Sequence, residues 1–139
     1  MSDKETTKIR KEILAEVSGD IFELGFGTGL NLPHYPGHVK KLVTADPNPG
    51  MMKAAQERIA NSPIEVDCRV LGGEALPFDD ASFDAIVCTW TLCSIPDADR
   101  VLAHCHRVLR PGGKFFFVEH GLADDSTVRK WQARLEPLR

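Results

Sequence analysis

The sequence lacks the patterns that would place it in several specialised classes of protein. Its four cysteines form no Cys-x-x-Cys pair, so we predict no metal site and interpret them as small buried side chains. The net charge is −3 and no basic cluster stands out, which argues against nucleic acid as a partner. The longest apolar run near the C-terminus, Phe115 to Val118, is too short for a membrane span.

Two further absences concern targeting and metal binding. Residues 1–11 are charged and lack the apolar core of a signal peptide, so we expect a cytoplasmic protein. His104, Cys105 and His106 are consecutive on a predicted helix, where neighbouring side chains point in different directions and cannot converge on one ion. The length of 139 residues, 42% of them hydrophobic, predicts a single globular domain over residues 1–139.

The sequence does contain a short strand that runs directly into glycines. Ile21 to Leu24 is predicted as a buried strand, and Gly25, Gly27 and Gly29 follow at once. Such glycines allow a tight turn and bring bare backbone against a ligand. Glu23 stands at the carboxyl end of this strand, the edge where ligands bind in an open parallel sheet. We therefore predict a loop that binds a nucleotide cofactor.

Apolar periodicity along the rest of the chain predicts alternating helices and strands. The expected strands are residues 21–24, 41–45, 64–70, 83–90 and 114–119, and the expected helices are 3–18, 30–35, 51–59, 97–109 and a last one carrying Val128, Trp131 and Leu135. This alternation is typical of an α/β, doubly wound, three-layer sandwich with a parallel sheet. The strand order 3-2-1-4-5 follows if the cofactor crevice lies between strands one and four.

A second acidic residue supports the assignment of the glycine loop. Asp46 ends the second strand, 17 residues beyond Gly29, where a carboxylate can accept two hydrogen bonds from a ribose diol. A nicotinamide dehydrogenase of the same fold is the alternative reading. It should have Gly-x-Gly-x-x-Gly, but Leu30 stands where the third glycine of that fingerprint belongs.

Five motifs in unbroken order resemble those of class I S-adenosylmethionine-dependent methyltransferases, over about residues 15–120. They are Glu23-x-Gly25-x-Gly27-x-Gly29, Asp46, Gly73-Glu74-Ala75-Leu76-Pro77-Phe78, Phe83-Asp84 and Leu109-Arg110-Pro111-Gly112-Gly113. The chain is most similar to the methyltransferase type 11 group, which includes quinone-biosynthesis and alkyl-thiol methyltransferases. Asp46-Pro47-Asn48-Pro49, Val87-Cys88-Thr89 and Glu119-His120 favour the thiol enzymes.

The resemblance implies a Rossmann-like fold, S-adenosylmethionine as cofactor and a set of residue roles. The glycines would approach the methionine part with Glu23 holding its amino group, and Asp46 would bind the ribose hydroxyls. Pro47 or Asn48 would pack on the adenine, with Gly73 and Glu74 at its edge. Cys88, Thr89 and Trp90 would form walls of the methyl site. The expected cofactor-binding residues are thus Glu23, Gly25, Gly27, Gly29, Asp46, Pro47, Asn48, Gly73, Glu74, Cys88 and Thr89.

Methyl transfer requires little from side chains, because the sulfonium is already activated and the protein mainly aligns the nucleophile and excludes water. His120, at the end of the fifth strand, is the candidate general base, although a purely structural histidine is the alternative. We expect transfer to a small or lipophilic thiol, quinol or amine. A cofactor-binding module without catalysis and an NAD-dependent oxidoreductase are the alternatives.

The C-terminal part departs from the resemblance. Relatives continue past the fifth strand into two more strands, whereas this chain ends at Arg139. Strand five, with its apolar run from Phe115 to Val118, would then be an unpaired edge. We therefore expect a homo-oligomer that associates through strand five or through exchange of the C-terminal helix.

Overall fold

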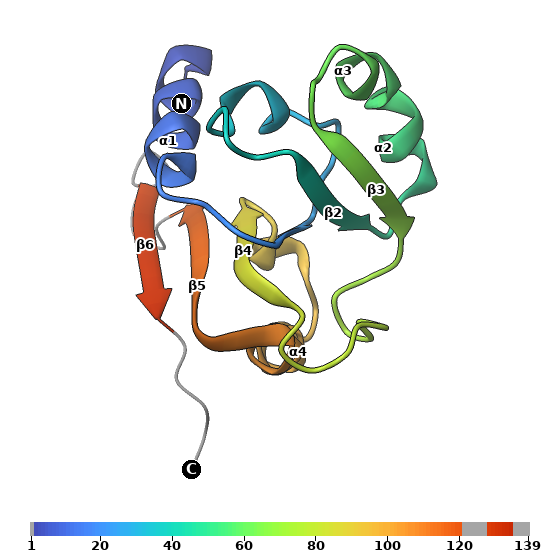
Figure 1. Cartoon of the computed structure of the whole chain (residues 1–139), viewed down its shortest axis with the longest axis vertical. Coiled ribbons are helices and arrows are strands. Elements are labelled where there is room, and N and C mark those ends of the chain that lie inside the picture. The colour runs from blue at the N-terminus through green and yellow to red at the C-terminus, as the bar shows by residue number, and fades with distance from the viewer. Residues whose placement is uncertain (1, 121–127, 135–139) are drawn as a thin grey trace.

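The computed structural model describes residues 2–119 in full and the backbone of residues 120 and 128–134. A sheet forms the centre of the molecule, with strand order β3-β2-β1-β4-β5-β6 (Figure 1). The first five strands pair with one another in parallel, so the predicted order 3-2-1-4-5 is confirmed. The strands are β1 (Ile21–Leu24), β2 (Lys41–Asp46), β3 (Glu65–Val70), β4 (Phe83–Thr89), β5 (Leu109–His120) and β6 (Val128–Arg134).

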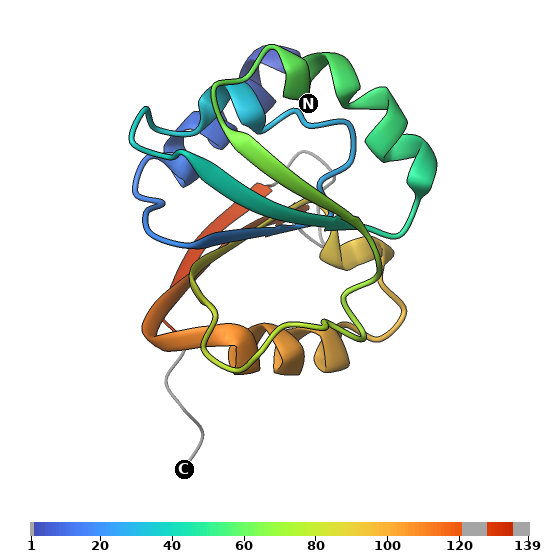
Figure 2. The same cartoon turned by 45° about the vertical axis from the view of Figure 1, so that its right-hand side comes forward.

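Helices cover both faces of this sheet and complete the three layers (Figure 2). The N-terminal helix and the helices between β1 and β3 lie on one face, and the helix before β5 lies on the other. The helices are α1 (Asp3–Leu14), η1 (Leu32–His34), α2 (Pro49–Ala54), α3 (Gln56–Ala60), η2 (Leu92–Ser94) and α4 (Ala98–Val108). The single helix expected over residues 51–59 is thus two short helices that meet at Ala55.

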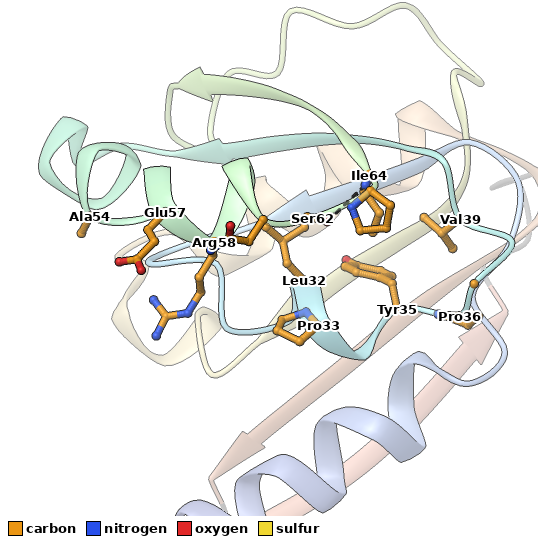
Figure 3. Close-up of a pocket in the computed structure, with 13 residues that line it drawn as sticks. Leu32, Pro33, Tyr35, Pro36, Val39, Ala54, Glu57, Arg58, Ser62 and Ile64 are labelled. Carbon is orange, nitrogen blue, oxygen red and sulfur yellow. Dashed lines mark hydrogen bonds between the residues drawn. The ribbon is translucent and has the colours of Figure 1, made fainter.

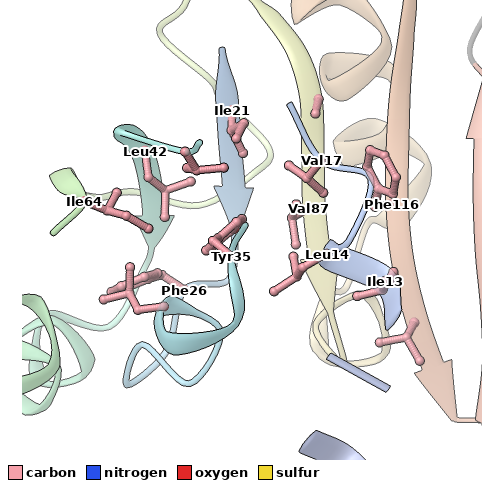
Figure 4. Packing of buried hydrophobic residues seen from close by; sticks show 14 of the residues in the cluster. Ile13, Leu14, Val17, Ile21, Phe26, Tyr35, Leu42, Ile64, Val87 and Phe116 are labelled. Carbon is pink, nitrogen blue, oxygen red and sulfur yellow. The ribbon is translucent and has the colours of Figure 1, made fainter. Parts of the chain in front are cut away.

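Each face of the sheet has its own hydrophobic core. On the α1 face, Leu14 and Val17 pack with Val87 of β4 and Phe116 of β5 (Figure 4). On the α4 face, Ile86 belongs to the cluster that contains the buried side of that helix. Successive residues of β4 are buried on opposite faces, as expected of a central parallel strand. The site is therefore built at the end of a strand held rigidly from both sides.

The cysteines and the helices allow two checks of the sequence analysis. Cys88 and Cys105 are buried as expected. Cys93 is exposed and Cys68 is only half-buried, so the prediction of four buried thiols is wrong for Cys68 and Cys93. No group of His, Cys, Asp and Glu residues that could hold a metal occurs among the described residues. In the same part of the chain, no helix has the length and apolar character that crossing a bilayer requires.

The C-terminal segment differs from the prediction. Residues 128–134 form a strand antiparallel to β5, with pairs from Lys114↔Arg134 to His120↔Val128, where we expected a helix. The outer N–H and C=O groups of β5 explain the difference, because a helix cannot satisfy them and a strand can. The predicted bare edge of strand five is therefore wrong, and with it the reason given for self-association. Leu135 lies outside the described residues.

Candidate functional site

A cavity of about 470 Å³ opens where β1, β2 and β4 end. It lies at the crevice between β1 and β4, where the winding of the sheet reverses direction, as predicted. Eight of the eleven predicted cofactor-binding residues line it, namely Gly25, Gly27, Asp46, Pro47, Asn48, Gly73, Glu74 and Thr89. The sequence motifs after three different strands therefore converge on one cavity.

Two glycines of the loop, Gly25 and Gly27, lack a side chain for different physical reasons. Gly25, Gly27 and Gly29 all have positive φ, at 75°, 58° and 82°. A Cβ on Gly25 would overlap the side chain of Thr91, whose own Cβ would be 2.8 Å away. A Cβ on Gly27 would meet no protein atom within 4 Å. Gly25 is thus required by close packing against the loop after β4, whereas Gly27 leaves open space in the cavity.

Asp46 ties the glycine loop to the turn after β2. Its Oδ2 accepts a hydrogen bond from the Gly27 N–H at 3.0 Å, and its Oδ1 accepts one from the Asn48 N–H at 2.9 Å. Each carboxylate oxygen can accept a further bond, so the group can still receive the hydroxyls of a diol. Two backbone donors therefore hold the carboxylate in position before any ligand arrives.

Glu23 lies beneath the cavity and is not part of its lining. The side chain is 1% exposed, and its Oε1 accepts a hydrogen bond from the Tyr35 hydroxyl at 2.6 Å. Burial raises the pKa of Glu23 to about 7, although hydrogen bonds from Tyr35 and Asn31 and the charge of Arg10 act in the opposite direction. The structure thus separates this carboxyl group from the space in which a ligand would lie.

Two other predicted residues, Gly29 and Cys88, are also not part of the described cavity lining. Gly29 packs under the Phe26 ring, with a Cβ position 3.2 Å from Phe26 Cζ, and Cys88 is fully buried. His120 is the last residue of β5, but its side chain lies outside the described residues. Its role as general base stays a prediction.

Arg10, which the sequence analysis missed, and Trp90, which it expected in the wall of the methyl site, lie together in the lining of the cavity. Arg10 of α1 donates from Nη1 to Asn31 Oδ1 at 2.7 Å, and its guanidinium carbon lies 4.9 Å from the centre of the Trp90 ring. Trp90 follows β4 with a φ of 48°, a conformation rare for a bulky side chain. No sequence signal marks Arg10, because it is one of several charges between the apolar positions of α1.

The loop after β4 forms the remaining wall and is held by Glu119 of β5. Glu119 Oε1 accepts hydrogen bonds from the N–H groups of Leu92, at 2.8 Å, and Thr91, at 3.2 Å. This carboxylate therefore fixes η2 and the lining residues next to it, Ser94, Ile95 and Pro96. Glu119, the first residue of the Glu119-His120 motif, thus has a structural role.

A second cavity of about 460 Å³ lies on the outer side of η1, against α3 (Figure 3). Its walls combine apolar side chains, such as Leu32 and Ile64, with polar ones, such as Glu57 and Arg58. It contains none of the predicted cofactor-binding residues. The polar groups suited to a nucleotide cofactor are in the first cavity.

The parallel sheet, the glycine turn and the acid after β2 define a Rossmann-like domain that binds a nucleotide cofactor. Residues 22–117 match the family model described as methyltransferase domain, and the chain belongs to this family. The match decides against the NAD-dependent alternative. Because the chain belongs to a family of methyltransferases and is similar to S-adenosylmethionine-dependent enzymes of known structure, its cofactor is S-adenosylmethionine.

Curated relatives and solved structures agree with this assignment. The human thiol S-methyltransferase TMT1A is 40% identical over 121 residues, which are 84% of this chain and 49% of the relative. The ubiquinone/menaquinone biosynthesis C-methyltransferase UbiE of Escherichia coli is 34% identical over 104 residues, 71% of this chain and 41% of the relative. The crystal structure of the YcgJ protein from Bacillus subtilis superposes with a TM-score of 0.73 at 25% identity, covering 83% of this chain and 51% of that one. The chain thus spans about half the length of these proteins.

The residues of the cavity fit the cofactor's chemistry. Asp46 presents a carboxylate suited to the ribose diol, and Gly73 and Glu74 line the same cavity. The open space over Gly27 allows a ligand to contact the backbone, and Arg10 supplies a positive charge at the other end. The bound cofactor supplies an activated methyl group, and these residues would hold and orient it.

We predict that Asp46→Ala weakens S-adenosylmethionine binding by about 1–3 kcal/mol, because the charge-assisted hydrogen bonds to the ribose are lost. Part of this effect comes from releasing the Gly27 N–H that Asp46 holds. Isothermal titration calorimetry measures the affinity, with Asp67→Ala as a control carboxylate on β3 that does not line the cavity. An unchanged affinity for Asp46→Ala would mean that the ribose is bound elsewhere.

Proposed function

We propose that this domain transfers the methyl group of S-adenosylmethionine to the sulfur of a small or lipophilic thiol. Thiol S-methyltransferases from human, rat and mouse are among its relatives, at 33% to 40% identity. A C-methyltransferase and a phosphatidylethanolamine N-methyltransferase are also similar to the chain, so similarity alone leaves the acceptor open. The composition of the cavity wall supports a thiol among these acceptors.

The observation that carries the proposal is the scarcity of bases in the cavity. Among the described lining residues there is no histidine, lysine or tyrosine, and the two carboxylates, Asp46 and Glu74, are in the part assigned to the nucleoside. A thiol has a pKa of about 8.5 and forms a useful fraction of thiolate at neutral pH without help. Amines are protonated there, and a quinol must lose its proton before its carbon attacks. A thiol is therefore the acceptor that needs the least help with proton removal from the residues of this wall.

The methyl end of the cavity suits an apolar acceptor. Leu30, Trp90, Ile95 and Pro96 contribute apolar surface to the wall of the cavity. A lipophilic thiol would displace water from this surface, and water exclusion favours the displacement reaction. In that step the thiolate sulfur forms a bond to the methyl carbon, the carbon–sulfonium bond breaks, and the thiol proton passes to solvent.

A methyl-release assay over matched alkyl thiols, quinols and amines tests the proposal. We expect turnover with thiols, at a rate that rises with pH as more thiolate forms. Turnover with quinols or amines in place of thiols would contradict the thiol assignment. Calorimetric binding of S-adenosylhomocysteine without any turnover would identify the domain as a cofactor-binding module.

His120→Gln tests the predicted general base separately. If His120 removes the thiol proton, the variant should lose about 10²-fold in rate with a thiol of high pKa and much less with an acidic aromatic thiol, which is already ionised. The ratio of the two rates in wild type and variant is the measurement. Equal losses with both thiols would instead point to a structural role.

A further inference from the structure

We propose that Arg10 binds the α-carboxylate of S-adenosylmethionine, so that α1 forms the methionine end of the cofactor site. The inference rests on the proposed function only in taking S-adenosylmethionine as the ligand. It concerns a residue outside every motif that the sequence analysis used. Charge, position and preorganisation each support it.

Arg10 is the only cationic side chain among the described residues that line the cavity. The cofactor carries one carboxylate, at its amino-acid end, and an anion entering a partly buried site needs a positive partner. The negative side chains of the lining, Asp46 and Glu74, belong to the nucleoside part. The distribution of charge in the cavity therefore orients the cofactor with its carboxylate toward α1.

The sheet order gives the same orientation. Asp46 ends β2, whereas Thr89 ends β4 and Trp90 follows it. Thr89 is linked to Arg10 through Asn31, and Trp90 makes the cation–π contact with it. β2 and β4 are on opposite sides of β1. A cofactor with its ribose on Asp46 and its chain over the glycine loop after β1 consequently extends toward Arg10.

The guanidinium is held in place before the ligand binds. One N–H donates to Asn31 Oδ1, and Asn31, itself 1% exposed, donates to Thr89 Oγ1 at 3.2 Å. The Trp90 ring covers one face of the group. Among the described residues, no other hydrogen bond of Arg10 occurs, so further donors of its planar fork are available for a carboxylate.

The neighbouring acid does not oppose this role. Glu23 is covered by Tyr35, and burial raises its pKa to about 7, so much of it carries no charge near neutrality. A carboxylate bound to Arg10 would therefore meet little repulsion from Glu23. Because Glu23 is only partly ionised near neutrality, it does not fully neutralise the guanidinium of Arg10.

The test compares two ligands that differ in the carboxylate alone, S-adenosylmethionine and decarboxylated S-adenosylmethionine. Arg10→Gln keeps a donor for Asn31 but removes the charge. We expect calorimetry to show an affinity for S-adenosylmethionine reduced about 10- to 100-fold, the effect of losing charge-assisted hydrogen bonds, and an affinity for the decarboxylated ligand that changes less than about threefold. Lys11→Gln removes an exposed charge next to Arg10 on α1 and is the matched control, expected to change neither affinity.

The outcomes separate the inference from the proposed function. Equal losses for both ligands in Arg10→Gln would show that Arg10 only supports the wall, and no loss for either would show that the carboxylate is bound elsewhere. Either result overturns the inference while leaving the cofactor assignment intact. Failure of the wild-type protein to bind either ligand would overturn the cofactor assignment itself. Slower hydrogen exchange of α1 with S-adenosylmethionine, but not with the decarboxylated ligand, would support the inference independently.

Discussion

Gly27→Val is expected to reduce S-adenosylmethionine affinity more than 100-fold while the protein still folds. A Cβ at this position meets no protein atom within 4 Å, but Gly27 lines the cavity, so the branched side chain would fill space that the cofactor needs. The φ of 58° adds strain of about 1–3 kcal/mol to any residue with a side chain. Calorimetry gives the affinity, and thermal unfolding without ligand gives the cost to the fold.

Two other glycines serve as controls for this variant. Gly37→Val places the same side chain in an exposed loop where nothing lies within 4 Å and φ is not in the positive range, so neither affinity nor stability should change much. Gly25→Val should instead destabilise the protein itself, because its side chain would overlap Thr91. Normal cofactor binding by Gly27→Val would show that the assignment of the glycine loop is wrong.

The parts of the site that the sequence predicted are those determined by backbone geometry. A strand followed by glycines, and an acid at the end of the next strand, have few other uses, and both are at the predicted edge of the sheet. The strand order followed from the same reasoning, because the crevice must lie where the winding reverses. These features depend on residues close together in the sequence, so a local pattern reveals them.

The features that were missed depend on contacts between distant residues. Arg10 and Asn31 are separated by 21 positions, and nothing in the pattern of α1 indicates which of its charges faces the cavity. The same holds for Glu23, whose position predicted a ligand contact, because only the folded chain shows that Tyr35 covers it. The strand at residues 128–134 was predicted as a helix, since its apolar spacing does not reveal that β5 needs a partner.

The buried Glu23 leads to the second large expected effect, on the free energy of unfolding. Its folded pKa of about 7 lies above the ordinary value of 4.5, so between these pH values the native state binds more protons than the unfolded state. The contribution of Glu23 to stability is therefore present at pH 4.5 and is lost as the pH rises through about 7. A shift of this size corresponds to about 3 kcal/mol.

Glu23→Gln should remove this loss. The amide oxygen of glutamine can still accept the Tyr35 hydroxyl bond, and the side chain has nearly the same shape without a titrating proton. We expect the variant to be more stable than the wild type at pH 8, by up to about 3 kcal/mol, and to differ little from it at pH 4.5. Urea unfolding at the two pH values, with the linear extrapolation, measures the difference.

Glu16→Gln provides the comparison for an exposed carboxylate, and its effect on stability should be small and similar at both pH values. A Glu23→Gln variant that is no more stable than the wild type at pH 8 would mean that Glu23 is charged there at no cost. In that case the charge of Arg10 would have to outweigh the burial of Glu23, although burial is the larger influence on its pKa in this structure. Arg10→Gln would then destabilise the wild type strongly at pH 8 and the Glu23→Gln variant much less, and that double-mutant cycle measures the coupling between the two side chains directly.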